Sequence, residues 1–167
     1  MTIERRLARS GFTLTRGYPA PVEHVWRAFA QEDHKRQWWG AGDAMEAREW
    51  AFDFRVGGRD VAEGKFHHGP VSRYEAIYTD IVEPVRIVTT YDMWIDGVHM
   101  STSLASFEFE VIDAGTRFTH TEHGVFLDQF WDGGPQRELG TRGLLDQLGR
   151  YLTGPARSPA PGPGPAR

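Results

Sequence analysis

Apolar and polar residues alternate along most of the chain, and this pattern predicts a protein built mainly from β-strands. In the first such segment, residues 10–18, Phe12 and Leu14 alternate with Thr13 and Thr15, as expected of a strand with one buried face. Further strands are expected at residues 46–55, 60–68, 72–82, 85–94, 99–112 and 116–123. Short turns separate these segments, so the sequence predicts a long antiparallel meander.

Glycine and proline mark the expected turns. Gly57 and Gly58 indicate a hairpin over residues 56–59, because paired glycines supply the positive φ that tight turns need. The later strands are separated by Glu83 and Pro84, by Asp96 and Gly97, and by residues 113–115.

One face of the expected sheet is polar. Phe107, Phe109 and Val111 share one parity, whereas Glu108 and Glu110 share the other. Because alternate side chains of a strand point to opposite faces, this pattern is typical of a sheet with one wet side. The apolar face then needs a cover.

Two short helices are expected after the first strand. In residues 21–30, Val22, Val25, Trp26 and Phe29 recur at helical spacing, which predicts an amphipathic helix. A second helix over residues 32–37 leads into the adjacent Trp38 and Trp39 and ends at residues 40–42. A tryptophan combines a large apolar area with an N–H that needs a partner. We therefore expect one of the two to pack on the first helix and the other to lie at the rim of a pocket.

A last helix over residues 135–153 is expected to cover the sheet. Leu145, Leu148 and Leu152 form its apolar stripe, while Gly140 and Gly143 lower the helix propensity of its first half. Glycines on a helix face permit close approach of a backbone or a ligand.

These elements predict one α+β domain over residues 10–153. Residues 1–9 are expected to form an N-terminal extension, and residues 154–167 a disordered tail rich in proline and glycine. A length of 167 residues suits one domain with a substantial core.

Charge and composition narrow the range of partners. The net charge is −4, no cysteine is present, and no basic stripe follows a helix, so neither nucleic acid nor a disulfide framework is expected. No segment has the length of a signal-peptide core or a membrane span. We expect a cytoplasmic protein that uses no membrane.

The histidines do not have the spacing of a metal site. His67 and His68 are neighbours on one strand, and His120 and His123 are three residues apart, so the members of each pair point to opposite faces. We therefore expect no metal and no cofactor. His120 shares its parity with Phe118 and Glu122, so it faces a cavity if Phe118 does, either as a structural histidine or as an acid or base.

Aromatic residues make up 13% of the chain, enough to build either a thick core or the lining of an apolar cavity. Tyr78, Tyr91 and His120 are the polar candidates that could orient a ligand there. The full set of candidate ligand-binding residues is Trp39, Phe54, Phe66, Tyr78, Tyr91, Trp94, Phe107, Phe109, Phe118, His120, Leu144, Leu145 and Leu148. No catalytic residue is assigned.

Several segments, taken in order, resemble one protein family. They are APVEHVWRA at residues 20–28, WWG at 38–40, RVGGR at 55–59, DIVEPVRIV at 80–88, GTRFT at 115–119 and LLDQL at 144–148. Over residues 10–153 the chain resembles the START-like (SRPBCC) superfamily. More narrowly, it resembles the family named after the C-terminal domain of the activator of Hsp90 ATPase, close to polyketide-cyclase-like proteins.

The resemblance implies a helix-grip fold, in which a curved antiparallel sheet wraps around the C-terminal helix and leaves a hydrophobic cavity between them. It leaves three functions open: binding of a small hydrophobic or aromatic molecule, catalysis of the cyclase, aromatase or hydrolase type, and protein binding like that of the co-chaperone domain.

The sequence also departs from the family pattern. Residues 140–143 replace a usual Gly-Trp pair, and Lys35 stands where an apolar residue is usual. The co-chaperone's separate N-terminal domain has no counterpart in this sequence, so we do not expect a chaperone of the Hsp90 type as the partner. The oligomeric state stays open, with a homodimer as one alternative.

Overall fold

A computed structural model describes residues 4–155, and the chain forms a single seven-stranded antiparallel sheet with three α-helices. The strands are β1 (Leu7–Tyr18), β2 (Met45–Phe52), β3 (Arg59–Phe66), β4 (Val71–Val82), β5 (Arg86–Ile95), β6 (Val98–Ile112) and β7 (Gly115–Leu127). The helices are α1 (Val22–Ala30), α2 (Glu32–Lys35) and α3 (Gly134–Thr153), with 3-10 turns η1 (Gly42–Ala44) and η2 (Asp128–Phe130).

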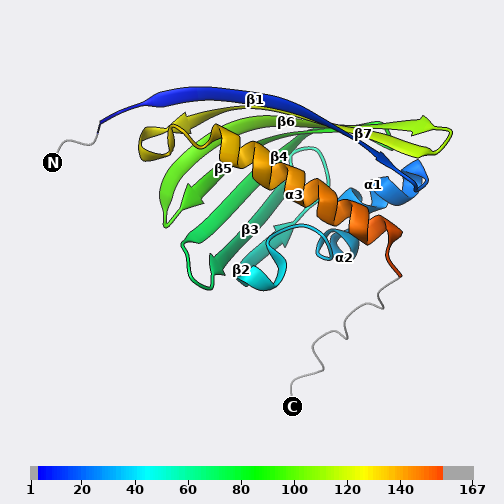
Figure 1. Ribbon diagram of the computed structural model, residues 1–167, viewed down its shortest axis with the longest axis horizontal. Coiled ribbons are helices and arrows are strands. Elements are labelled where there is room, and N and C mark those ends of the chain that lie inside the picture. Colours follow the sequence, from blue (N-terminus) through cyan, green and yellow to red (C-terminus); the bar gives the residue numbers. More distant parts are fainter. Residues whose placement is uncertain (1–3, 156–167) are drawn as a thin grey trace, which may run out of the picture.

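The sheet is a meander that the first strand completes. Its order is β1-β7-β6-β5-β4-β3-β2, so β2 to β7 pair consecutively and β1 adds at the β7 edge. The sheet curves around α3, which crosses its concave face, while α1 and α2 lie toward the C-terminal half of α3 (Figure 1). The predicted α+β helix-grip architecture is confirmed.

Several element bounds differ from those that the sequence predicted. β1 begins at Leu7, so part of the expected N-terminal extension pairs with β7, and β7 itself continues to Leu127. α2 ends at Lys35, two residues before the predicted end, and a turn carries the chain to the tryptophans. The predicted disordered tail lies outside the described residues from residue 156 onward.

The hairpin between β2 and β3 uses its two glycines differently. Gly57 has a φ of +82°, a conformation that glycine adopts without steric cost. Gly58 has an ordinary φ, but a Cβ there would lie 2.0 Å from the Asp53 carbonyl oxygen. The turn was predicted correctly; positive φ is needed at one of the two glycines, and close backbone approach requires the other.

Alternation along β6 separates a buried face from an exposed one, as predicted. Phe107 and Phe109 are buried and Glu108 and Glu110 are exposed. Val111 shares the parity of the two phenylalanines but is 71% exposed, because it lies next to the turn at the end of the strand, opposite Thr116.

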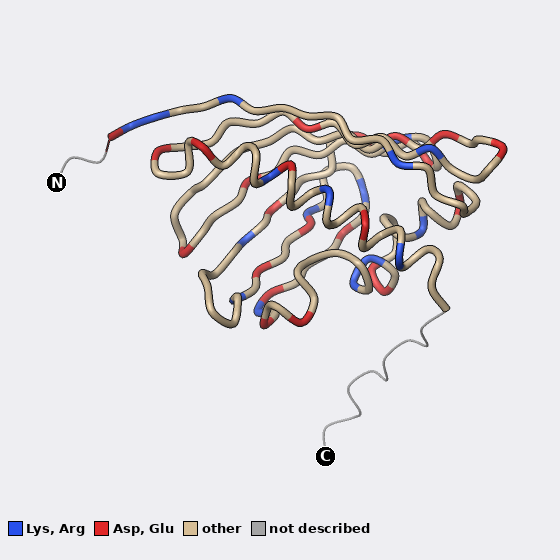
Figure 2. Tube along the Cα trace, in the orientation of Figure 1, with Lys and Arg blue, Asp and Glu red and all other residues tan. Residues whose placement is uncertain are grey.

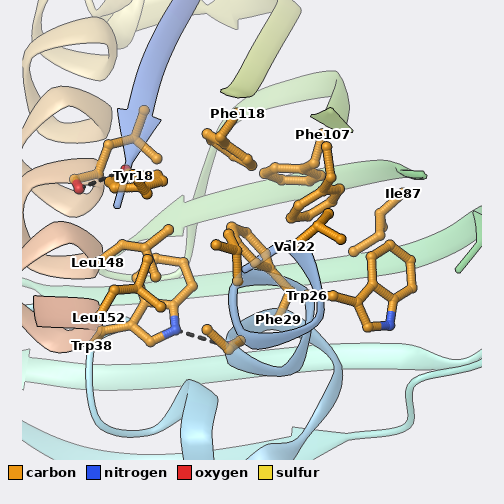
Figure 3. Close-up of a cluster of buried hydrophobic side chains, with 14 of the residues drawn as sticks. Tyr18, Val22, Trp26, Phe29, Trp38, Ile87, Phe107, Phe118, Leu148 and Leu152 are labelled. Atoms are coloured by element: carbon orange, nitrogen blue, oxygen red, sulfur yellow. Dashed lines mark hydrogen bonds between the residues drawn. The ribbon is translucent and has the colours of Figure 1, made fainter. Parts of the chain in front are cut away.

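The core joins the apolar stripe of α1 to the concave face of the sheet. Phe29 of α1 stacks on Phe118 at 5.3 Å between ring centroids and meets Phe109 edge to face at 5.2 Å. Leu148 of α3 is fully buried in the same cluster (Figure 3). Burying each such side chain contributes roughly 1.5–3 kcal/mol, so these contacts hold the two helices on the sheet.

Tyr18 ties the end of β1 to α3. Its buried hydroxyl donates to the Leu145 carbonyl oxygen at 2.8 Å, and burial raises the pKa of Tyr18 well above its ordinary value. We expect Tyr18→Phe to lower the free energy of unfolding by about 1 kcal/mol, the usual net value of one hydrogen bond. Urea denaturation measures this loss, and an unchanged midpoint would contradict the structural role.

Candidate functional site

A small cavity lies between the concave face of the sheet and α3. Its volume is about 40 Å³. Most of the wall is apolar and aromatic, and its polar side chains come from β4, β5, β7 and α3. The lining residues are Phe29, Trp38, Trp39, Tyr74, Tyr91, Ala105, Phe107, His120, Glu122, Thr141, Leu144 and Leu145.

The structure brings only part of the predicted set to this cavity. The candidates that line it are Trp39, Tyr91, Phe107, His120, Leu144 and Leu145. The lining residues that were not among the candidates are Phe29, Trp38, Tyr74, Ala105, Glu122 and Thr141. The parity shared by His120 and Glu122 had pointed to Glu122, and the periodicity of α1 places Phe29 on the buried face.

The remaining candidates lie elsewhere. Phe109, Phe118 and Leu148 are packed in the core, and Tyr78 is buried against Phe54 at 5.0 Å. Trp94 stacks on His99 at 5.3 Å, and Phe66 lies half-buried at the end of β3. Trp94 pairs with Arg73 and has the opposite parity to Tyr91, so parity argued against it. For Phe109 and Phe118 parity could not decide, because the core and the cavity share the concave face.

The two adjacent tryptophans take different positions. The Trp38 indole N–H donates to the Ala28 carbonyl oxygen of α1 at 2.8 Å (Figure 3). Trp39 is half-buried and packs against Tyr74 at 5.6 Å. Trp38 thus packs on α1, and Trp39 lies at a partly exposed edge of the cavity, the arrangement predicted for the pair.

A buried polar cluster adjoins the cavity; it consists of Arg137, Glu122, Tyr91, Ser101 and Ser103. The Arg137 guanidinium of α3 donates to the Tyr91 hydroxyl at 2.7 Å, to Glu122 Oε1 at 3.1 Å and to the Ser101 hydroxyl at 2.7 Å. A longer contact of 3.4 Å joins it to the Ser103 hydroxyl. Tyr91 in turn donates to Glu122 Oε1 at 2.6 Å. These contacts tie the first half of α3 to β5, β6 and β7.

Glu122 is ionised at neutral pH. Burial raises the pKa of this carboxyl, but hydrogen bonds from His120 and Tyr91, together with the charge of Arg137, outweigh burial and lower the pKa below its ordinary value. The cavity wall therefore contains a carboxylate whose charge Arg137 compensates.

His120 stands between this carboxylate and the aromatic wall. Its Nε2 lies 3.5 Å from Glu122 Oε2, and its ring packs on Phe107 at 4.7 Å. The side chain is buried, and its Nδ1 has no hydrogen-bond partner among the described residues. Buried polar atoms are rarely left unpaired, so Nδ1 is the atom of the wall that most needs a partner.

A second buried ion pair lies outside the cavity. Lys35 of α2 donates to Asp60 Oδ2 of β3, and the Tyr78 hydroxyl donates to the same oxygen at 2.9 Å. Lys35 also lies 4.5 Å from the centre of the Trp39 ring. The hydroxyl of Tyr78, a predicted ligand contact, is thus committed to Asp60. The unusual lysine fixes α2 and the indole that follows it.

In the described residues 4–155, no three His, Cys, Asp or Glu side chains lie close enough together to hold a metal ion. In the same residues, no helix has both the length and the hydropathy of a membrane span. A second hollow, between Pro19–Glu23 and Val111–Gly115, is lined mostly by exposed residues and lacks a buried titratable group.

Charges of both signs are spread over the coloured part of the trace, residues 4–155 (Figure 2). On the convex face, Arg73 pairs with Glu49, Glu63 and Glu75 at 2.6, 3.0 and 2.5 Å. Ile77 and Leu104 are exposed there on either side of Thr90. Mixed charge of this kind is typical of a solvated face rather than of a large apolar interface.

Comparisons with known proteins place these features in context. The sequence pattern of the family described as Activator of Hsp90 ATPase homolog 1-like protein matches residues 19–153. A solved protein of Rhizobium loti is 41% identical, with a TM-score of 0.81 over 88% of this chain and 99% of the other. An uncharacterised protein of Rhizobium leguminosarum is 34% identical, with a TM-score of 0.84 over 89% and 97%.

A more distant structure, the AHSA1-like protein of Aeromonas hydrophila, is 21% identical, with a TM-score of 0.63 over 85% of this chain and 91% of the other. At that identity the likeness concerns the fold. A search of curated proteins gave no match.

Proposed function

Since the chain belongs to the Activator of Hsp90 ATPase homolog 1-like family, we propose that it binds a small, mostly apolar molecule between its sheet and α3. The observation that carries this proposal is an aromatic cavity lined by His120, whose buried Nδ1 has no hydrogen-bond partner among residues 4–155. Ligand sites combine apolar walls with a few polar groups that fix orientation, and this wall has that composition.

Binding requires the cavity to widen. A volume of about 40 Å³ has room for roughly three waters, so a ring-sized ligand must displace part of the wall. Trp39, Thr141 and Leu144 are partly exposed and form the edge through which it would enter. Gly140 and Gly143 are exposed and a Cβ at either would meet no atom within 4 Å, so no other element packs on the outer face of α3 there.

The first test is native mass spectrometry of the purified protein, followed by thermal shifts with aromatic compounds. A ligand that binds only the folded state raises its apparent stability by mass action. Co-purified mass or a concentration-dependent shift supports the proposal. Neither effect across the panel would count against any small-molecule role.

Filling the cavity should abolish binding. Ala105 lines the cavity and is buried at the middle of β6, so Ala105→Leu adds methylene groups directly to the free space. We expect at least a tenfold loss of affinity at a stability cost of about 1–3 kcal/mol, measured by calorimetric titration and urea denaturation. The matched control is Ala51→Leu at an exposed position of β2, which should bind normally. Equal affinity in both variants would place the ligand elsewhere.

A second candidate is acid–base catalysis on the bound molecule, as in cyclases or hydrolases. The observation that favours it is the His120 and Glu122 pair at 3.5 Å in the cavity wall, since a carboxylate beside an imidazole orients it for proton transfer. Tyr78 has no part in this proposal, because it does not line the cavity. Conversion of a bound compound by the wild type, lost in Glu122→Gln while binding persists, would support catalysis.

A further inference from the structure

We propose that the ligand is a neutral aromatic molecule that carries a hydrogen-bond donor, an O–H or N–H group, and that His120 Nδ1 accepts this hydrogen bond. The inference rests on the proposed function and specifies the polar group of the ligand. It follows from the polar groups of the wall that already have partners and from one atom, His120 Nδ1, that is fully buried without a partner among the described residues.

Tyr91, Arg137 and Thr141, three polar residues in or beside the wall, already have partners. The Tyr91 hydroxyl donates to Glu122 and accepts from Arg137. The Arg137 guanidinium also donates hydrogen bonds to the Glu122 carboxylate and to the hydroxyls of Ser101 and Ser103. The Thr141 hydroxyl donates to the Arg137 carbonyl oxygen at 2.9 Å. These groups hold one another in place and already donate hydrogen bonds, whereas His120 Nδ1 is buried and has no partner at all among the described residues.

The position of the proton on a neutral His120 imidazole follows from the neighbouring carboxylate. Glu122 is a carboxylate and can only accept, and its Oε2 faces His120 Nε2. A neutral imidazole therefore carries its proton on Nε2, which leaves Nδ1 with a lone pair. That lone pair is buried and has no partner in the described part of the chain, and the group that complements it is a donor.

Charge argues against an anionic ligand. The Arg137 guanidinium beside the cavity already forms an ion pair with the Glu122 carboxylate, and it also donates a hydrogen bond to the Ser101 hydroxyl. A ligand carboxylate would meet the lone pair of Nδ1 and the nearby Glu122 carboxylate, with no uncommitted cation among the residues that line the cavity to compensate it. A neutral phenol-like group avoids both costs.

The composition of the wall suits an aromatic ring. The cavity is lined by Phe29, Trp38, Trp39, Tyr74 and Phe107, and aromatic groups pack on aromatic side chains edge to face or offset. A two-ring probe with one hydroxyl group therefore combines both requirements.

Four naphthalenes test the inference on the wild-type protein. 2-Naphthol carries a donor, 2-methylnaphthalene has the same size without one, 2-methoxynaphthalene has only an acceptor, and 2-naphthoate has a negative charge. Calorimetric titration should give 2-naphthol about a tenfold lower Kd than either neutral analogue, the usual effect of one net hydrogen bond. 2-Naphthoate should bind most weakly.

Variants of His120 identify the acceptor. His120→Phe keeps a ring but removes the lone pair, so 2-naphthol and 2-methylnaphthalene should bind with equal affinity. His120→Asn places an amide oxygen near the position of Nδ1 and should restore part of the preference for 2-naphthol. Thermal unfolding confirms that each variant is folded, and the ligand series on the wild type stands even if one is not.

The outcomes separate this inference from the proposed function. Equal binding of 2-naphthol and 2-methylnaphthalene to the wild type, or tightest binding of 2-naphthoate, would overturn the inference and leave a ligand-binding protein. Preference for 2-naphthol that survives in His120→Phe would also overturn it. Failure of all four compounds to bind, with no co-purified mass, would overturn the proposed function and the inference with it.

Discussion

Asp60→Ala is expected to lower the free energy of unfolding by about 3–5 kcal/mol, because it leaves a buried ammonium group without its counter-ion. Lys35 and Asp60 expose 5% and 1% of their side chains. The Tyr78 hydroxyl would also lose its acceptor. Urea denaturation at neutral pH measures the loss.

The matched control removes both charges. Lys35→Met with Asp60→Ala replaces the ion pair by apolar groups, and such replacements are often close to neutral. The double variant should therefore be more stable than Asp60→Ala alone. If it is equally unstable, the loss comes from the cavity left at residue 60 rather than from the unpaired charge.

Arg137→Met is expected to destabilise the protein by about 3 kcal/mol at pH 7, for a related reason. The substitution keeps most of the apolar stem, but it removes the guanidinium, whose carbon lies 4.9 Å from the centre of the Phe126 ring, and with it the positive charge beside the buried Glu122 carboxylate. An uncompensated buried charge costs several kcal/mol. Because the same side chain reaches β5, β6 and β7, the first half of α3 should also lose protection from hydrogen exchange.

The loss from Arg137→Met should depend on pH. In the wild type the pKa of Glu122 lies below its ordinary value of 4.5, so its ionised form stabilises the fold at neutral pH and this contribution disappears as the pH falls through the folded-state pKa. Without Arg137 the pKa of Glu122 rises, because the effect of burial is then offset only by His120 and Tyr91. The deficit of the variant is therefore fully present at pH 7 and narrows toward pH 4.

Glu122→Gln isolates this carboxyl from all the others. When Glu122→Gln is introduced both into the wild type and into Arg137→Met, the stability difference between the two resulting proteins should no longer change with pH. Urea titrations at pH 7, 5.5 and 4, all chosen as rough steps through the carboxyl range, provide the comparison. A deficit that stays pH-dependent would assign the effect to another group.

The sequence predicted the fold well where pattern and partner agree. The alternation of β6 and the apolar stripes of α1 and α3 each predict one buried face. In the structure these faces are buried in the common core. The bounds of β1 and β7 were predicted less well, because the pairing of Leu7 with Leu127 depends on a strand far away in the sequence. Local patterns contain no record of such a partner.

The candidate site could be predicted only in part. The aromatic wall follows from parity, but parity cannot separate Phe107, which lines the cavity, from Phe118, which is packed in the core. Arg137 was missed because one arginine in a helix is usually solvated. Ser101 and Ser103 offered a signal, since they share the parity of Phe107 on β6, and polar residues on a buried face require a polar partner from the covering element.

The place of β1 in the sheet has a consequence for biosynthesis. The strand that is made first pairs with the strand that is made last, and α3 follows directly after it. The β2 to β7 meander can form from neighbours as the chain lengthens, whereas β1 must wait until β7 has left the ribosome, since contacts between distant segments pay the largest loop-closure entropy. Until β1 has added, the β7 edge is an unpaired strand edge, and until α3 is made the concave face has no cover. Such an edge can pair with other chains, so the nascent chain depends on rapid completion of the fold.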